Sequence, residues 1–228
     1  MTPKARRSVR IVLLLGVALV LSSCMFLPDF WGQKQSGKYD PVADTQPRPS
    51  EVAAVPVAET QTEPHTCGLH AMRSAYVAYG LDPDTFRLRF RLGTDEPAMR
   101  ADKDSTGTLH PDLYRVLVQD GFLIDVVDLE KDYAPMLLQS HLAWQQLGLA
   151  VVYRSTYHWV LLGPADRASE VVVYDSLKAK PETVLIETML DDALSITLIE
   201  PNAGEPMSAS DAHGWGLAEM GRLYQRKE

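Results

Sequence analysis

The sequence predicts an α+β fold, with helices in the first part of the chain and an antiparallel sheet in the second. Apolar residues at helical spacing dominate before residue 148. The segments after it are short, rich in valine, leucine and tyrosine, and separated by turn residues. From about Val52 to the C-terminus the chain is long enough for one domain with its own hydrophobic core.

The first predicted helix begins at Cys67. Alanine and aromatic residues recur at helical spacing from there to Tyr79, and Gly80 ends the pattern. Thr66 has the side chain of an N-cap, which would place Cys67 in the first helical turn. Further helices are predicted at residues 84–90, 111–119 and 134–147.

The predicted strands lie mainly in the second half of the chain. Their composition favours β structure at residues 122–128, 149–154, 159–163, 170–174 and 195–199. Residues 164–169 favour a turn, so the two strands on either side of them should form a hairpin. Two more helices are predicted in this half, at residues 182–190 and 216–226.

The register of that hairpin decides where two polar side chains lie. We expect Leu162 to face Val171. This register puts His158 opposite Asp175, with both side chains on the same face of the sheet.

The N-terminus has the three regions of a secretory signal. A basic start is followed by an almost wholly apolar run at residues 11–21 and then by Ser22, Ser23 and Cys24. The run is shorter than the roughly 20 residues that a membrane-spanning helix needs; an uncleaved apolar anchor is the alternative. Leu21-Ser-Ser-Cys24 resembles the bacterial lipobox, which implies removal of residues 1–23 and lipidation of Cys24.

The rest of the chain divides by composition. Residues 24–54 are rich in proline, glutamine and serine and are predicted to be a tether, residues 55–200 form the domain, and residues 201–228 are a C-terminal tail. Met25 stands where an aspartate would follow Cys24 in a retained lipoprotein, which resembles the outer-membrane sorting pattern of Gram-negative bacteria. We therefore expect a protein of the bacterial cell envelope, lipid-anchored at the outer membrane and facing the periplasm.

The charge of the chain excludes some partners. The formal net charge is −8, and removal of four basic residues with the signal would lower it to −12. Such an acidic protein is a poor partner for nucleic acid or for an anionic lipid surface. We expect no nucleic-acid partner, and we expect the membrane attachment to come from the lipid on Cys24.

Cys67 is the residue that most directly indicates a function. The chain has two cysteines, and the lipobox accounts for Cys24, so Cys67 has no disulfide partner. It is either a nucleophile or a buried small apolar residue. A position in the first turn of a helix stabilises a thiolate, which favours the nucleophile.

Attack of a thiolate on an acyl carbon needs a base, a group that orients the base, and hydrogen-bond donors for the oxyanion. We expect Cys67 to be the nucleophile, His158 the base and Asp175 the orienting group. Gln61, six residues before Cys67, can offer its side-chain amide to the oxyanion beside the Cys67 backbone N–H. A metal site around His70 would need further ligands at suitable spacing, which the sequence lacks, so no metal or cofactor is expected.

Three segments carry a resemblance to a known family: Gln61-Thr-Glu-Pro-His-Thr-Cys67-Gly68, Tyr157-His158-Trp-Val-Leu-Leu-Gly163 and Val173-Tyr-Asp175. They resemble the papain-type cysteine peptidases, and most nearly the bacteriocin-processing, double-glycine peptidase-like family. The resemblance implies a papain-like fold with helices packed on an antiparallel sheet, and catalytic roles for the same four residues.

Two departures limit what the resemblance implies. Leu69-His70 follows Cys67-Gly68, where the family has a small residue or proline, and Ser176 follows Asp175, where the family often has proline. The substrate of the family is therefore not carried over.

The sequence as a whole predicts a membrane-anchored, extracytoplasmic cysteine peptidase that cleaves a peptide or protein. Two alternatives remain open. One is a transglutaminase-like acyltransferase, which uses cysteine, histidine and aspartate in the same order. The other is a peptide-binding lipoprotein that has the fold without catalytic turnover.

Overall fold

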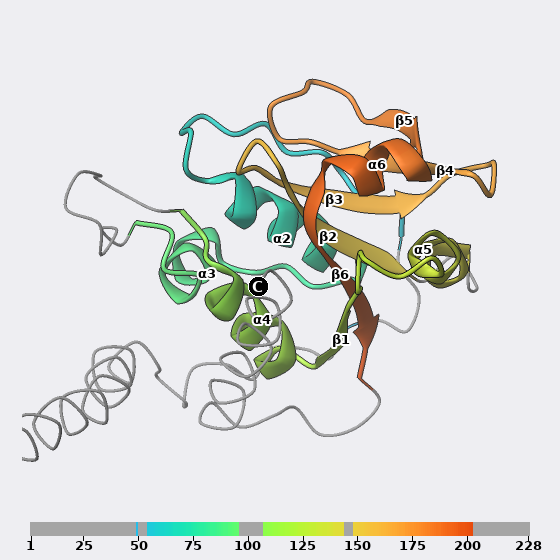
Figure 1. Cartoon of the computed structure of the whole chain (residues 1–228). Coiled ribbons are helices and arrows are strands. Elements are labelled where there is room, and N and C mark those ends of the chain that lie inside the picture. The colour runs from blue at the N-terminus through green and yellow to red at the C-terminus, as the bar shows by residue number, and fades with distance from the viewer. Residues whose placement is uncertain (1–48, 50–53, 96–106, 144–147, 203–228) are drawn as a thin grey trace, which may run out of the picture. The chain divides into compact units, whose positions relative to one another are not determined.

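The computed structural model describes residues 49, 54–95, 107–143 and 148–202 (Figure 1). They lie in the second of two compact units of the chain, Thr45–Glu228. The predicted signal, Cys24, most of the tether and the helix at residues 216–226 lie outside the described residues. The described part has the predicted α+β fold, with helices packed on a six-stranded antiparallel sheet.

The order of the strands across the sheet is β1-β6-β2-β3-β4-β5. The helices are α2 (Cys67–Ala78), α3 (Thr85–Arg91), α4 (His110–Gln119), α5 (Ala134–Ala143) and α6 (Ile186–Asp192). The strands are β1 (Phe122–Val126), β2 (Leu149–Arg154), β3 (Trp159–Pro164), β4 (Glu170–Tyr174), β5 (Glu182–Leu185) and β6 (Ala193–Pro201).

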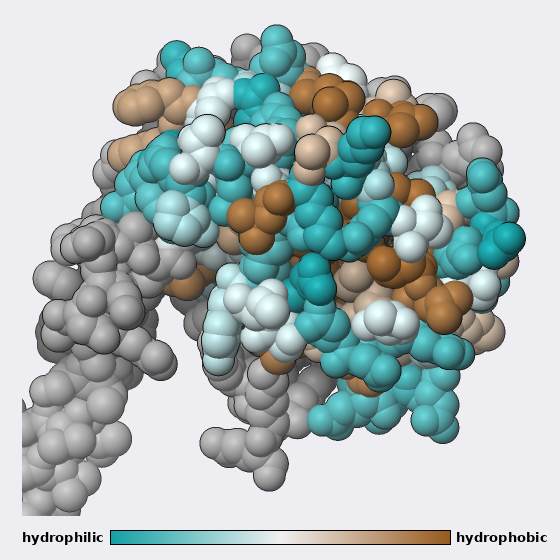
Figure 2. All heavy atoms as spheres, turned by 90° about the horizontal axis from the view of Figure 1, so that it is seen from above, coloured by the Kyte–Doolittle hydropathy of each residue, from teal (hydrophilic) through white to brown (hydrophobic). Residues whose placement is uncertain are grey.

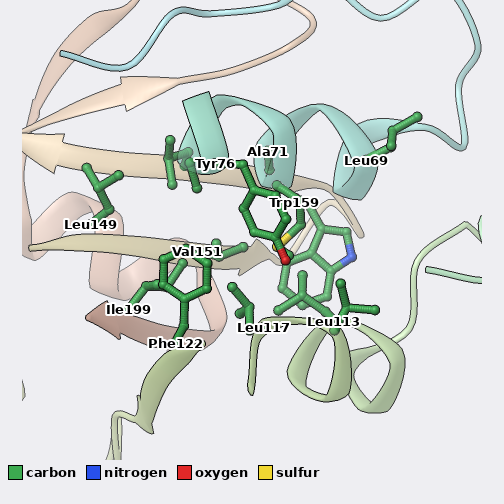
Figure 3. Packing of buried hydrophobic residues seen from close by; sticks show 14 of the residues in the cluster. Leu69, Ala71, Tyr76, Leu113, Leu117, Phe122, Leu149, Val151, Trp159 and Ile199 are labelled. Carbon is green, nitrogen blue, oxygen red and sulfur yellow. The ribbon is translucent and has the colours of Figure 1, made fainter. Parts of the chain in front are cut away.

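The sheet separates two hydrophobic clusters. On one face, residues of α2, α3 and α4 pack against Trp159 and Leu161 of β3. Figure 3 shows Trp159 with Tyr76 of α2 and Leu113 of α4. On the other face, residues of α5 and α6 pack against Val160 and Leu162 of the same strand. The alternation along β3 follows the period of two that a strand buried on both faces requires.

The helix that carries Cys67 forms for the reasons given by the sequence. Met72, Ala75 and Tyr79 are fully buried against the sheet, and Gly80 ends the helix with a φ of 76°. Within the described residues no helix is long and apolar enough to span a bilayer. On the face shown in Figure 2, hydrophobic side chains form several separate groups between hydrophilic ones.

The predicted helix at residues 182–190 is wrong in its first half. Residues Glu182–Leu185 form strand β5, and helix α6 begins only at Ile186. Val184 pairs with Val171 of β4, and the residues of β5 alternate between half-buried and exposed. The β-branched residues therefore extend the sheet by one strand, a tertiary effect that helical spacing alone does not reveal.

The expected pairing of β3 with β4 is confirmed, but the expected register is wrong by two residues. Leu162 faces Val173 instead of Val171, and Pro164 faces Val171. The turn has the predicted six residues but lies one residue further along the chain, at residues 165–170, and within it the Glu170 N–H donates to the Arg167 carbonyl oxygen at 3.0 Å. A shift of two residues keeps every side chain on its expected face.

The first turn of α2 packs closely against the segment that precedes α4. A Cβ atom at Gly68 would lie 2.5 Å from Cβ of Thr108 and 2.6 Å from its Oγ1. Thr108 is buried, and its carbonyl oxygen accepts a hydrogen bond of 2.9 Å from the indole Nε1 of Trp159 on β3. Gly68 thus permits the approach that places Cys67 next to the start of β3.

We expect Gly68→Ala to lower the free energy of unfolding by about 1–3 kcal/mol, the usual cost of overpacking a core. Urea denaturation measures it. Thr108→Gly should restore most of the loss when combined with Gly68→Ala, whereas Thr108→Ala should not, because it keeps the Cβ atom that clashes. Equal rescue by both variants would show that the contact with Thr108 Cβ is not the cause.

Candidate active site

Cys67 lies at the N-terminal end of α2, with 6% of its surface exposed. Thr66 occupies the N-cap position, but the expected cap hydrogen bond is absent: its hydroxyl donates instead to the Glu63 carbonyl oxygen at 2.8 Å. Backbone N–H groups at this end of a helix stabilise a nearby negative charge.

His158 and Asp175 are hydrogen-bonded to each other. Nε2 of His158 lies 2.7 Å from Oδ1 of Asp175, and both residues are buried. The same Oδ1 accepts the backbone N–H of Leu177 at 2.9 Å. The carboxylate therefore has a fixed orientation toward the imidazole.

The positions of these two residues follow from the strands. His158 immediately precedes β3, and Asp175 immediately follows β4. In the observed register the last pair of the ladder is Leu161 with Tyr174, so the two side chains meet diagonally instead of directly opposite each other. Diagonal neighbours on one face remain within reach of long side chains.

The Cys67 thiol also acts on His158 and favours its protonated form. Burial disfavours the charged imidazolium, but the hydrogen bonds and the Coulombic attraction of Cys67 and Asp175 outweigh it, so the pKa of His158 is raised above its ordinary value. Because Nε2 is bonded to Asp175, Nδ1 is the ring nitrogen left for an interaction with the thiol. One imidazole thus connects a thiol to a buried carboxylate.

Gln61 reaches this region because residues 54–61 run back along α2. The Ala54 N–H donates to the Ala78 carbonyl oxygen at 2.6 Å, and Oγ of Ser74 donates to the Val57 carbonyl oxygen at 2.7 Å. At the end of this segment the Gln61 N–H donates to the carbonyl oxygen of Ser176 at 2.9 Å.

The side chain of Gln61 is bonded both to the segment after Asp175 and to the turn before Cys67. Its Oε1 accepts a hydrogen bond from Oγ of Ser176 at 2.5 Å, and its Nε2 donates to the Glu63 carbonyl oxygen at 3.2 Å. That carbonyl oxygen is also the one that accepts the Thr66 hydroxyl. The amide therefore lies beside the turn that leads into Cys67 and has a second N–H to offer. Its role toward an oxyanion stays a prediction.

A charged cluster stabilises the turn before Cys67. The carboxylates of Glu63 and Asp95 each form two hydrogen bonds with the Arg89 guanidinium, at 2.6–2.8 Å. These bonds lower the pKa of both carboxyl groups. Glu63, His65 and Asp95 offer ligand atoms within 4.8 Å of one another, as a metal site would. The Arg89 guanidinium already occupies both carboxylates, so we interpret the cluster as an ion-pair network.

Sequence reasoning missed three residues that contact the site residues. Ser176 binds Gln61, Thr108 packs against Gly68, and Arg154 lies 3.7 Å from Asp175. Ser176 and Arg154 are close in sequence to Asp175 and His158, which is the signal that could have found them. Thr108 gives no such signal, because only the packing of α2 brings it near.

The sequence matches no protein-family model, and a search among curated proteins gives no match. Among solved structures, the chain is similar to a double glycine motif protease from an AMS/PCAT transporter in complex with the leader peptide. Identity is 14% and the TM-score is 0.50, covering 70% of this chain and 100% of that chain. The peptidase domain of Streptococcus ComA, a bi-functional ABC transporter, has 12% identity and a TM-score of 0.48, covering 65% of this chain and 100% of that chain.

We compare the fold of this chain with the first of these structures. The chain has the mixed helical and antiparallel sheet fold of the double-glycine peptidase domains, which is papain-like, and the predicted fold class is confirmed.

We expect Asp175→Asn to lower the pKa of His158, because the variant removes the negative charge that favours the imidazolium. The charged form, and the stability it adds to the folded state, would then be lost at a lower pH than in the wild type. An NMR titration of histidine ring signals, with His158→Ala to assign the resonance, measures the change. Asp166→Asn, at an exposed turn, should leave the titration unchanged. A wild-type titration curve for Asp175→Asn would contradict the assigned interaction.

Proposed function

We propose that this protein is a cysteine peptidase that cleaves a peptide or protein substrate. The observation that carries the proposal is the position of His158, which is hydrogen-bonded to Asp175 and whose protonated form is favoured by the Cys67 thiol. A thiol, a base and a group that orients the base are the parts that thiolate attack on an acyl carbon requires.

The proposed reaction begins with transfer of the Cys67 proton to His158. The thiolate attacks the carbonyl carbon of the scissile bond and forms a tetrahedral intermediate. The oxyanion of this intermediate accepts hydrogen bonds from the first-turn amides of α2 and from the second N–H of the Gln61 side chain. His158 then donates its proton to the leaving amine, which departs and leaves a thioester on Cys67.

Hydrolysis of the thioester regenerates the enzyme. Neutral His158 takes a proton from water, the resulting hydroxide attacks the thioester carbon, and collapse of the second intermediate releases the acid product and the thiolate. Asp175 keeps the imidazole in the tautomer that presents Nδ1 to the sulfur and stabilises the imidazolium in both steps. These reaction steps need no metal or cofactor.

We further propose that the enzyme works outside the cytoplasm, anchored by a lipid on Cys24 at the outer membrane. The support is the order of basic, apolar and small residues that ends in Leu21-Ser-Ser-Cys24. A lipidated cysteine with several acyl chains holds a protein stably at a membrane, which a single chain does not.

We expect Cys67→Ala to abolish cleavage. Cells that carry the wild type or Cys67→Ala are compared by N-terminal labelling of their envelope and secreted proteins, and a new N-terminus that depends on the thiol identifies the substrate.

On a peptide that spans the cleavage site, His158→Ala should lower kcat by about 10²–10⁴-fold, the usual contribution of a general base. Gln61→Ala should lower it by about 10²–10³-fold, as loss of an oxyanion donor does.

Two results would replace this proposal. Thiol-dependent incorporation of a primary amine into a glutamine-containing protein would identify an acyltransferase. Identical N-termini in both strains would favour a peptide-binding lipoprotein, provided that Cys67 is also alkylated no faster in the wild type than in the His158→Ala variant.

We expect Cys24→Ala to release the protein from membranes without loss of activity on an accessible peptide. The reason is that Cys24 and Cys67 lie in parts of the chain joined by the predicted tether, so anchoring and catalysis are independent. Membrane fractionation and the mass of the N-terminal peptide measure the change, and Ser23→Ala, which keeps the small residue before the cysteine, is the control. Unchanged membrane retention in Cys24→Ala would contradict lipidation.

A further inference from the structure

Three residues, Ser155-Thr156-Tyr157, form the loop between Arg154, the last residue of β2, and His158, which precedes β3. The Tyr157 N–H donates to the Arg154 carbonyl oxygen, and the Arg154 N–H donates to the His158 carbonyl oxygen, each at 2.9 Å. Tyr157 has a φ of 60°, the left-handed conformation that the last position of such a loop requires. This loop makes Arg154 and His158 neighbours across the hairpin.

The side chain of Arg154 contacts the carboxylate that holds His158. Its Nη1 lies 3.7 Å from Oδ2 of Asp175, while Oδ1 of the same carboxylate binds His158. The two oxygens of Asp175 thus face two different cationic groups. Only a quarter of the Arg154 side chain is exposed, so solvent screens this interaction less than it would at the open surface.

A second carboxylate holds Arg154 from the other side. Nε of Arg154 donates to Oδ2 of Asp192, the last residue of α6, at 2.5 Å. Asp192 is itself fixed, because its other carboxylate oxygen accepts the Ser155 hydroxyl and its backbone carbonyl oxygen accepts the Ser155 N–H at 2.7 Å. The pairing of β2 with β6 shifts between Tyr153 and Arg154, and an irregularity of this kind redirects a side chain.

The charged groups therefore form one row across the end of the sheet. Asp192 comes from α6 on one face and Cys67 from α2 on the other, and Arg154, Asp175 and His158 lie between them. The row alternates in sign when His158 is protonated and Cys67 is a thiolate. A change at one end alters the attraction that His158 experiences.

We propose that Arg154 is a positioning residue that acts on His158 through Asp175. It shares the negative charge of Asp175, so that His158 can give its proton to the leaving amine and enter the hydrolytic half of the reaction as the neutral base, instead of keeping the proton in an overly stable ion pair. Asp192 in turn limits how strongly Arg154 competes for Asp175. This inference rests on the proposed function, because it concerns the same histidine.

The test is an NMR titration of the His158 ring in three variants, which needs no substrate. Arg154→Gln removes the competing cation, so His158 should titrate at higher pH than in the wild type. Asp192→Asn leaves the full charge of Arg154 to Asp175, so His158 should titrate at lower pH. Arg154→Lys keeps the charge and should lie closer to the wild type than Arg154→Gln does. Arg167→Gln, at a side chain that is 79% exposed, is the matched control and should change nothing.

The opposite directions separate this role from a structural one. If the row only stabilised the fold, Arg154→Gln and Asp192→Asn would move the titration in the same direction or not at all, and either result would overturn the inference. Should Arg154→Gln fail to fold, the shift in Asp192→Asn alone decides. Cys67→Ala tests the proposed function itself: it should lower the pH at which His158 titrates. An unchanged titration there contradicts the proposed function, whereas a shift there without the opposed shifts contradicts only the role of Arg154.

Discussion

The hydrogen-bonded ladder between β3 and β4 is the constraint on which the site depends. It fixes the distance between the start of one strand and the end of the next, where His158 and Asp175 lie. The ladder is held by core side chains of both strands: Val160, Leu162, Val171 and Val173 are at most 1% exposed. A slip of one residue would turn these side chains toward the other hydrophobic cluster and would move the two polar residues off their shared face, so packing of the core also fixes the geometry of the hydrogen bond.

The thiol comes to the same place by a different route. Helix α2 packs on the opposite face of the sheet from α6, and its position depends on the fully buried residues Met72 and Ala75 and on the close approach of Gly68 to Thr108. The site therefore forms where both layers reach the end of the sheet. Each layer has its own hydrophobic cluster. A substitution in one cluster should therefore change the distance between Cys67 and His158 before it unfolds the other layer.

Much of this arrangement could be predicted from the sequence. The spacing of alanines and aromatic residues gave α2, valine-rich runs gave the central strands, and the order of Gln61, Cys67, His158 and Asp175 predicted a single region where they meet. The structure brings these four residues into that region, while their catalytic roles remain the proposal made above.

The errors have physical causes that a sequence does not display. Residues 182–185 became a strand because an edge of the sheet was free to pair with them. The hairpin register moved by two residues because a turn inside the loop uses Glu170. The Thr66 hydroxyl donates to the Glu63 carbonyl oxygen instead of accepting a hydrogen bond from an amide of the helix. Arg154 lies only four residues before His158, but its contacts with Asp175 and Asp192 join residues that are distant in sequence. Each case is decided by a tertiary contact.

The path of residues 54–61 along α2 has a mechanical consequence. Ala54 and Val57 are bonded to Ala78 and Ser74, toward the end of α2 that is remote from Cys67. Glu59 then pairs with Arg73 at 3.0 Å before the chain reaches Gln61. A force that pulls on the chain from its N-terminal side would load these bonds one after another and would reach Gln61 last. The bonds of residues 54–59 would therefore bear the tension first, and the positions of the thiol and its neighbours would stay unchanged.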